Sequence, residues 1–233
     1  MLNVFVLTPF PDLVQIITKN SILGRAQKKG LVSYRIYNLF DYSDPPHNRI
    51  DDYPFGGGKG MILKPEPIFR IIKEIKANNG ENEKYRIIFP TPDGKRYNQK
   101  KASKFSKCDN IIFICGHYKG IDERVRLKLV TDEISIGDFV LTGGELPSMI
   151  ILDSVIRLIP GALNSFESAK NDSFMDQLLD HPHYTRPEKY KELQVPNVLL
   201  SGNHQKIDEW RKNKREEKTK NIRPDLWKKY IKK

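Results

Sequence analysis

The chain has 233 residues, 38% of them hydrophobic, and a formal net charge of +11. This length supports one large domain plus a small second one, and the two cysteines, Cys108 and Cys115, lack metal-ligand spacing and match reduced cytosolic thiols. No basic leader and no stretch of about 20 apolar residues occurs, which argues against membrane insertion and predicts a soluble cytoplasmic protein.

Strands and helices alternate through the first 160 residues. We predict strands at 2–8, 32–38, 85–89 and 111–115, and helices at 11–18, 65–77, 98–107 and 121–129. In the first helix we expect Leu13, Ile16 and Ile17 to face inward. The alternation predicts an α/β fold, with a mostly parallel sheet covered by helices on both faces.

The passage 133–148 joins a β-branched run to an apolar helix. Ile134, Ile136 and Val140 favour an extended backbone, and the chain turns at Gly143 and Gly144. Glycine permits dihedrals and close approaches that a side chain would block, so this corner can receive a ligand directly on main chain. The alternative is a plain strand-to-helix turn without a ligand.

Two other glycine-containing corners end predicted strands, at 90–94 and 116–120. In a parallel sheet all three corners fall at the same edge, where ligands of such sheets bind. Neither a G-x-G-x-x-G nor a phosphate-loop motif can be placed at them, so phosphate cradling is not the favoured function. A fourth glycine-rich loop, 51–61, is expected to be a mobile flap.

The composition changes after Pro160 and Gly161. We predict a ligand-binding domain at 1–161, a linker at 162–173 and a basic, mainly helical domain at 174–233. Residues 184–233 contain fifteen Lys or Arg and seven Asp or Glu, so +8 of the net +11 lies there, together with both tryptophans. Cations interleaved with aromatic rings favour a nucleic-acid partner, although a solvated helical face is the alternative.

Five segments, in order along the whole chain, resemble bacterial tRNA (guanine-N1)-methyltransferases: 55–61, 116–125, 135–145, 172–174 and 179–187. The resemblance implies a SPOUT fold with a trefoil knot, and a homodimer whose active site lies between subunits. Pattern reading alone indicates neither feature, since knots are very rare. It also implies methyl transfer from S-adenosylmethionine to N1 of the guanosine immediately 3′ of the tRNA anticodon, position 37, which gives 1-methylguanosine.

The resemblance implies site residues as well. The cofactor would be held by the main chain and side chains of Thr91, Pro92, Gly116, Tyr118, Ser135, Ile136, Gly137, Phe139, Leu141, Gly143 and Gly144. The tRNA would be contacted by Gly57, Gly58, Asp180, His183, Tyr184 and Arg186. A Mg²⁺ requirement is suggested too, but no ligand cluster is visible and no metal ligand is predicted. His181 and His183 could ligate a metal, but an RNA-contacting or structural role is favoured for them.

Methylation of guanine N1 needs a base for the N1 proton and a cation for the charge that develops on O6. Asp172 matches the base of the family and Arg157 its O6-stabilising arginine. The alternatives are a helix-capping Asp172 and a surface Arg157 whose side chain only extends to water.

The chain departs from the family pattern at Lys119, where relatives carry Glu, and at Phe55 and Phe139, where they carry Tyr. A lysine cannot accept a hydrogen bond, so no catalytic role is assigned to Lys119. Two other functions stay open at this point: a related SPOUT methylase acting on ribosomal RNA, and a basic RNA-binding protein without catalysis.

Overall fold

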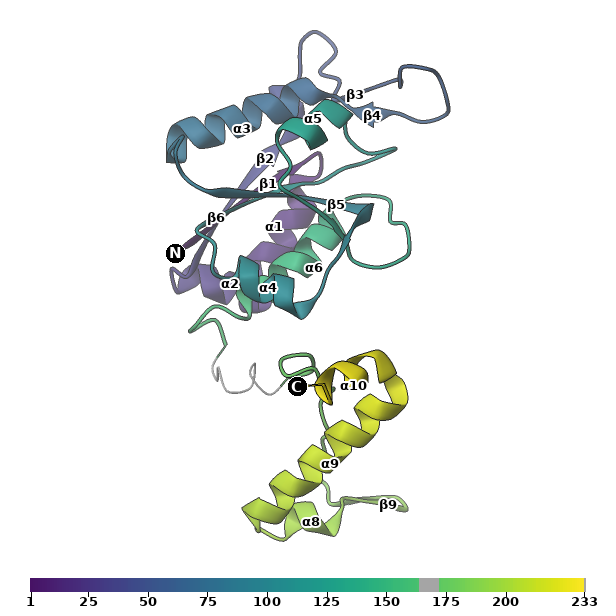
Figure 1. Cartoon of the computed structure of the whole chain (residues 1–233). Helices are drawn as coiled ribbons and strands as arrows, with labels where there is room; N and C mark the ends of the chain where they lie inside the picture. Colours follow the sequence, from purple (N-terminus) through teal and green to yellow (C-terminus); the bar gives the residue numbers. More distant parts are fainter. Residues whose placement is uncertain (164–171, 233) are drawn as a thin grey trace. The chain divides into compact units, whose positions relative to one another are not determined.

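The computed structural model describes residues 1–163 and 172–232. The chain divides into two compact units, residues 1–166 and 167–233 (Figure 1). This division falls inside the predicted linker 162–173, most of which lies outside the described residues.

The first unit is built on a five-stranded sheet in which every pair is parallel, in the order β2-β1-β6-β5-β7. Its strands are β1 (Leu2–Thr8), β2 (Val32–Asn38), β5 (Tyr85–Arg96), β6 (Asn110–Ile114) and β7 (Asp132–Ser135). Every residue of β6 is buried, as expected for a strand with helices above and below it. The predicted parallel α/β architecture is confirmed.

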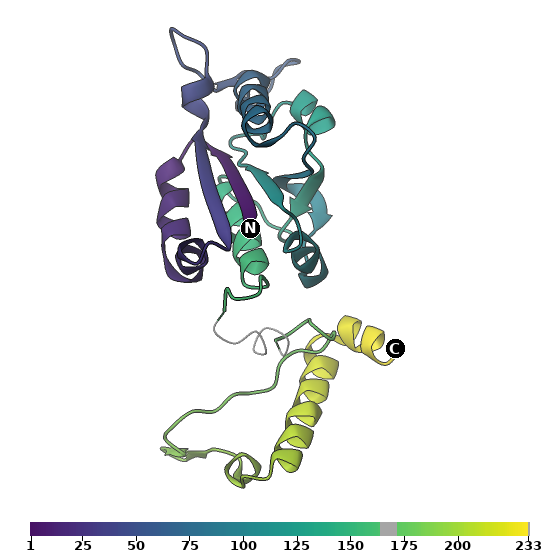
Figure 2. The same ribbon diagram turned by 90° about the vertical axis from the view of Figure 1, so that its left-hand side faces the viewer.

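Helices cover both faces of this sheet (Figures 1 and 2). One face packs against α1 (Pro11–Lys19), α2 (Ser21–Lys28), α4 (Gln99–Phe105) and α6 (Glu145–Ile156). The other packs against α3 (Pro65–Asn79) and α5 (Glu123–Lys128), with the short 3-10 turn η1 (Leu39–Tyr42) at its margin. Helix α2 follows α1 after a single residue and was not predicted from the sequence.

Three local predictions were wrong. In α1, Val14 and Thr18 are buried, whereas Leu13 and Ile16 are exposed. Strand β5 does not stop at Pro90: it bulges, and its pairing with β7 resumes at Lys95. Strand β7 ends at Ser135, so Val140 belongs to an exposed loop.

The glycine-rich loop 53–61 connects a small antiparallel hairpin, β3 (Asp51–Asp52) and β4 (Ile62–Leu63). The second strand of this hairpin, β4, lies against the corner after β6. Leu63 N–H donates to the Gly120 carbonyl, and Asp122 N–H donates to the Leu63 carbonyl, both at 3.0 Å. The loop is therefore anchored beside one of the predicted ligand-binding corners.

The described part of the second unit is mainly helical. It contains the hairpin β8 (Lys189–Tyr190) and β9 (Leu193–Gln194) and the helices α8 (Asn197–Leu200), α9 (His204–Ile222) and α10 (Pro224–Tyr230). Figure 2 shows α9 as its longest helix. Trp210 and Trp227 are half-buried rather than enclosed in a core. Among the described helices of both units, none is long and apolar enough to cross a membrane.

Candidate active site

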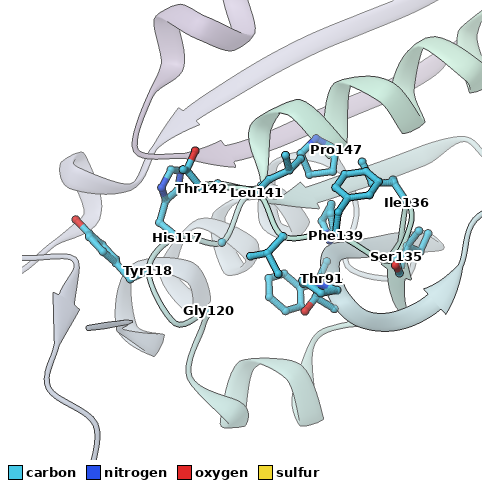
Figure 3. A pocket seen from close by; sticks show the side chains of 18 of the residues that line it. Thr91, His117, Tyr118, Gly120, Ser135, Ile136, Phe139, Leu141, Thr142 and Pro147 are labelled. Carbon is cyan, nitrogen blue, oxygen red and sulfur yellow. The ribbon is translucent and has the colours of Figure 1, made fainter. Parts of the chain in front are cut away.

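A pocket of about 290 Å³ opens beside the bulge of β5 and the carboxyl ends of β6 and β7 (Figure 3). All eleven residues predicted to hold the cofactor line it: Thr91, Pro92, Gly116, Tyr118, Ser135, Ile136, Gly137, Phe139, Leu141, Gly143 and Gly144. They come from three segments far apart in sequence, which the parallel topology brings to one edge. The structure thus assembles them into one cavity, while their role in binding stays a prediction.

The wall formed by 90–96 is fixed by a cluster of charges. Arg126 donates to Glu133 on β7 at 2.8 Å and to Asp93 in the β5 bulge at 2.8 Å, and Asp93 also accepts from Thr91. The Thr91 hydroxyl and then the Arg126 guanidinium hold the pKa of Asp93 below its usual value, and Arg126 does the same for the pKa of Glu133. These contacts hold Thr91 at the pocket lining.

Gly143 and Gly144 are required by packing rather than by backbone conformation. Neither has a positive φ, but a Cβ on Gly144 would lie 2.7 Å from Gly116 N and 2.8 Å from Cys115 Cα. A Cβ on Gly143 would meet the His117 ring. These glycines let the corner lie directly on 115–117, where Gly144 N–H donates to the Gly116 carbonyl at 2.8 Å. That a ligand also lies on their main chain stays a prediction.

Lys119 lies at the pocket lining, and its aliphatic chain packs on Gly60, where a Cβ would stand 2.9 Å from Lys119 Cγ. Gly57 and Gly58, predicted to contact tRNA, are exposed with φ of +80° and +113° and have nothing within 4 Å of an added Cβ. The glycine-rich loop therefore borders the pocket through Lys119 and presents open main chain beyond it.

Arg157 is not among the residues that line this pocket. It is the half-buried residue that caps the carboxyl end of α6, whereas Glu145 begins that helix beside the pocket. Twelve helical steps of 1.5 Å separate the two residues by about 18 Å. The structure therefore keeps Arg157 in the same unit as the pocket but at the opposite end of α6.

Asp172 is the first described residue of the second unit, and it is half-buried. The alternative that it caps a helix is wrong, because 172–178 forms turns and bends, with positive φ at Phe174 and Gln177. Met175 N–H approaches the Asp172 carbonyl at 3.4 Å in one of these turns.

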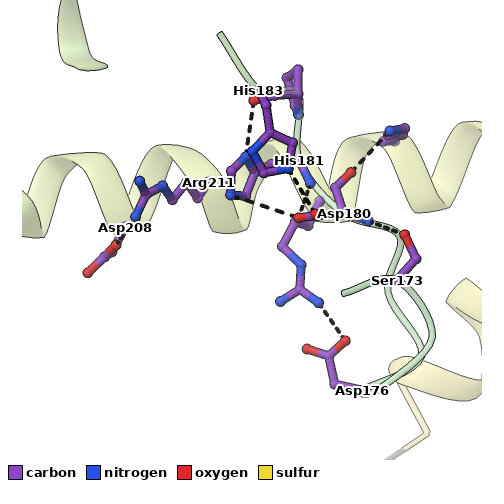
Figure 4. A network of polar contacts seen from close by, with 10 residues as sticks. Ser173, Asp176, Asp180, His181, His183, Asp208 and Arg211 are labelled. Atoms are coloured by element: carbon purple, nitrogen blue, oxygen red, sulfur yellow. Dashed lines mark hydrogen bonds and ion pairs between the residues drawn. The ribbon is translucent and has the colours of Figure 1, made fainter. Parts of the chain in front are cut away.

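The predicted tRNA contacts of the second unit come from the segment before β8, and Figure 4 shows two of them, Asp180 and His183. His183 Nε2 lies 2.9 Å from Asp180 Oδ2, and Lys218 of α9 donates to the Asp180 carbonyl at 3.1 Å. Tyr184 is half exposed, with its ring 6.4 Å from that of Trp210, and Arg186 is exposed. Cationic and aromatic groups therefore share one surface of this unit.

Asp180, His181 and His183 were not predicted as a metal site, yet their ligand atoms lie within 4.8 Å of one another. Two imidazoles suit a transition metal, whereas Mg²⁺ prefers oxygen ligands. Among the residues that the structure describes, this cluster does not match the Mg²⁺ requirement suggested by the resemblance.

Nine further residues of the pocket lining were not predicted as site residues: Phe89, Pro90, His117, Lys119, Gly120, Ile134, Val140, Thr142 and Pro147. Among them, His117 lies in the corner that follows β6. Its Nε2 lies 2.7 Å from the buried Glu145 carboxylate, a contact that joins residues 28 positions apart. The sequence carries no periodic signal for such a pair.

Fold and site together define an α/β protein with a pocket of small-molecule size at one edge of a parallel sheet and with a basic second unit. The sequence profile of the family described as tRNA (guanine-1)-methyltransferase TrmD matches residues 2–229. The chain belongs to this family.

Similar proteins named tRNA (guanine-N(1)-)-methyltransferase occur in several bacteria. The one from Bacillus pumilus is 54% identical over 94% of this chain and 89% of its own length. Those from Bacillus subtilis and Clostridioides difficile are 53% and 51% identical, over 95% and 96% of this chain and 90% and 96% of their own lengths. The similarity therefore extends over both units.

Proposed function

We propose that this protein transfers a methyl group from S-adenosylmethionine to N1 of the guanosine at position 37 of tRNA, giving 1-methylguanosine. The observation that carries the proposal is the assembly of all eleven predicted cofactor residues around one pocket, in a chain that belongs to the tRNA (guanine-1)-methyltransferase family.

The pocket suits such a cofactor in size and chemistry. Its volume of about 290 Å³ is near the lower end of the usual range for small-molecule sites, about 300–1,000 Å³. Backbone groups of the three corners offer hydrogen bonds to an adenine edge and a ribose. Phe139, Val140 and Leu141 form an exposed apolar rim that a bound ligand would cover. S-adenosylmethionine supplies an electrophilic methyl group when bound.

The chemistry on the guanine side falls to Asp172 and Arg157. Neutral guanine holds a proton on N1, so Asp172 accepts that proton as the N1–methyl bond forms. General-base assistance of this kind contributes about 10²- to 10⁴-fold. Arg157 donates hydrogen bonds to O6, where negative charge develops as the proton leaves.

A homodimer resolves the separation of Arg157 from the pocket. Leu146 and Ile150 are about half exposed on α6, and Arg157 follows Ile150 by seven residues, so the three share one face of the helix. Exposed Phe10, Leu13 and Ile16 extend an apolar surface onto neighbouring α1. Pairing this surface with a second copy about a twofold axis allows Arg157 of one subunit to serve the pocket of the other.

The proposal includes a trefoil knot and a cytoplasmic location. Residues 136–144 leave the edge strand β7 and return past β5 to the corner after β6, where Gly144 meets Gly116, which is compatible with a threaded chain. Cys108 and Cys115 are free thiols, as is usual in the cytoplasm.

Nucleoside analysis tests the function. The purified protein is incubated with unmodified tRNA transcript and methyl-labelled S-adenosylmethionine, and the tRNA is digested and examined by mass spectrometry. We expect the label on 1-methylguanosine. Label on another nucleoside would contradict the assigned acceptor, and RNA binding without cofactor uptake in calorimetry would support a non-catalytic RNA-binding protein instead.

A further inference from the structure

A buried carboxylate joins three segments of the pocket wall. Glu145, only 2% exposed, is the first residue of α6. Its Oε1 accepts a hydrogen bond from Thr8 Oγ1 at the end of β1, at 2.6 Å. Its Oε2 lies 2.7 Å from His117 Nε2 in the corner after β6. One side chain therefore ties the start of α6 to the ends of two central strands.

The hydrogen-bond pattern fixes the His117 ring. With Glu145 Oε2 as the acceptor, Nε2 of His117 is the N–H that donates this hydrogen bond. The edge of the ring is held by Phe10, with ring centroids 5.0 Å apart, and one side lies so close to Gly143 that a Cβ there would clash. His117 is thus held by Glu145, an aromatic ring and a bare glycine.

The same contact controls a wall of the pocket. His117 forms backbone bridges with Gly143 and Gly120, and its carbonyl accepts from Gly120 N–H at 2.9 Å. The corner 116–120 supplies Gly116 and Tyr118 to the lining, and the corner 141–144 supplies the opposite residues. Losing the Glu145–His117 bond would leave these two corners joined by backbone contacts alone.

We propose that Glu145 and His117 are positioning residues: their hydrogen bond holds the corner 116–120 against the corner 141–144 and thereby sets the affinity for S-adenosylmethionine. This inference rests on the proposed function and extends it to residues outside the predicted site. Glu145 acts through His117 and need not touch the cofactor.

Glu145→Gln tests the bond with little change in shape. The amide keeps an oxygen for Thr8 but turns an N–H donor toward His117 Nε2, so the two groups no longer match unless the imidazole changes tautomer. We expect the Kd for S-adenosylmethionine, measured by calorimetry, to rise about tenfold or more, the scale of one charge-assisted hydrogen bond. The KM for the cofactor should rise in step, with the KM for tRNA unchanged.

Two variants of His117 probe the bond without altering α6. His117→Gln places an amide N–H near the position of Nε2 and should bind the cofactor more tightly than His117→Leu, which has no donor. Glu66→Gln is the matched control, because Glu66 also lies in the first turn of a helix, α3, but is exposed and does not line the pocket. Its Kd should equal that of the unaltered protein.

The inference is overturned if Glu145→Gln and His117→Leu bind the cofactor with unchanged Kd. A lower number of binding sites per chain with unchanged Kd would likewise overturn it, since that result indicates loss of folded protein rather than of positioning. Failure of the unaltered protein to bind S-adenosylmethionine would contradict the proposed function itself.

Discussion

At the scale of single residues, the sequence best predicts site residues whose grouping follows from the order of strands and loops. Thr91, Gly116 and Ser135 were expected together because each follows a parallel strand, and they line one pocket. The sequence alone could not show why glycine is needed at positions 143 and 144. The need arises from how closely this corner lies on residues 115–117. Glu145 was missed for a similar reason: a glutamate at the start of a helix is usually solvated, and only the fold shows that this one is buried.

Asp172→Asn is the most informative single substitution. The amide keeps the size of the side chain but cannot accept the N1 proton, so we expect turnover to fall by about 10²- to 10⁴-fold. Cofactor affinity and thermal stability should stay near those of the unaltered protein. Single-turnover methylation and calorimetry check both expectations, with Asp208→Asn, an exposed aspartate of α9, as control. Near-normal turnover would remove Asp172 as the base.

At the scale of elements, periodicity located most helices and strands but not the irregular segments. Strand β5 was predicted to end at Pro90, because proline has no N–H to donate to a neighbouring strand. The chain instead bulges there and pairs with β7 again at Lys95. On α1 the spacing of apolar residues was correct for a helix, but Leu13 and Ile16 face outward. An apolar stripe on a helix does not say whether it packs on its own sheet or on another subunit.

The Arg126 cluster should make the β5–β7 edge sensitive to acid. Because the folded-state pKa values of Asp93 and Glu133 are lowered, their pairing stabilises the fold above the ordinary values of 3.8 and 4.5 and is lost as pH falls through the lower folded values. Arg126→Gln should cost about 1–2 kcal/mol at pH 7 and less at pH 3, by urea unfolding.

Arg70→Gln is the control for that comparison, because Arg70 and Asp44 form an exposed pair of small expected value. A penalty for Arg126→Gln that is equal at both pH values would show that the cluster stabilises through packing, not charge.

Gly144→Ala tests the packing account of the glycine corner. The added Cβ meets the backbone of Gly116 and Cys115, which cannot rotate away, so we expect a loss of about 1–3 kcal/mol in the free energy of unfolding. Gly202→Asn is the comparison: Gly202 has a φ of +68° and open space around it, and asparagine tolerates that region. Equal stability of both variants would refute the packing account.

At the scale of the whole molecule, the account requires two copies of the chain. Thr91→Trp fills the pocket, Arg157→Ala removes the O6 donor, and each homodimer should be inactive. A mixed dimer should regain activity, because one of its two sites combines an intact pocket with an intact Arg157 from the other subunit. Activity of co-purified heterodimers measures this. No recovery would show that each subunit uses its own Arg157.

The central claim is the position of the methyl group, and mapping it on tRNA is the most direct test. Two transcripts that differ only at nucleotide 37, guanosine or adenosine, are incubated with the protein and labelled S-adenosylmethionine, then cut into oligonucleotides for mass spectrometry. The account predicts one labelled oligonucleotide, containing 1-methylguanosine at position 37, and no label in the adenosine transcript. Equal labelling of both transcripts, or label in another oligonucleotide, would contradict it.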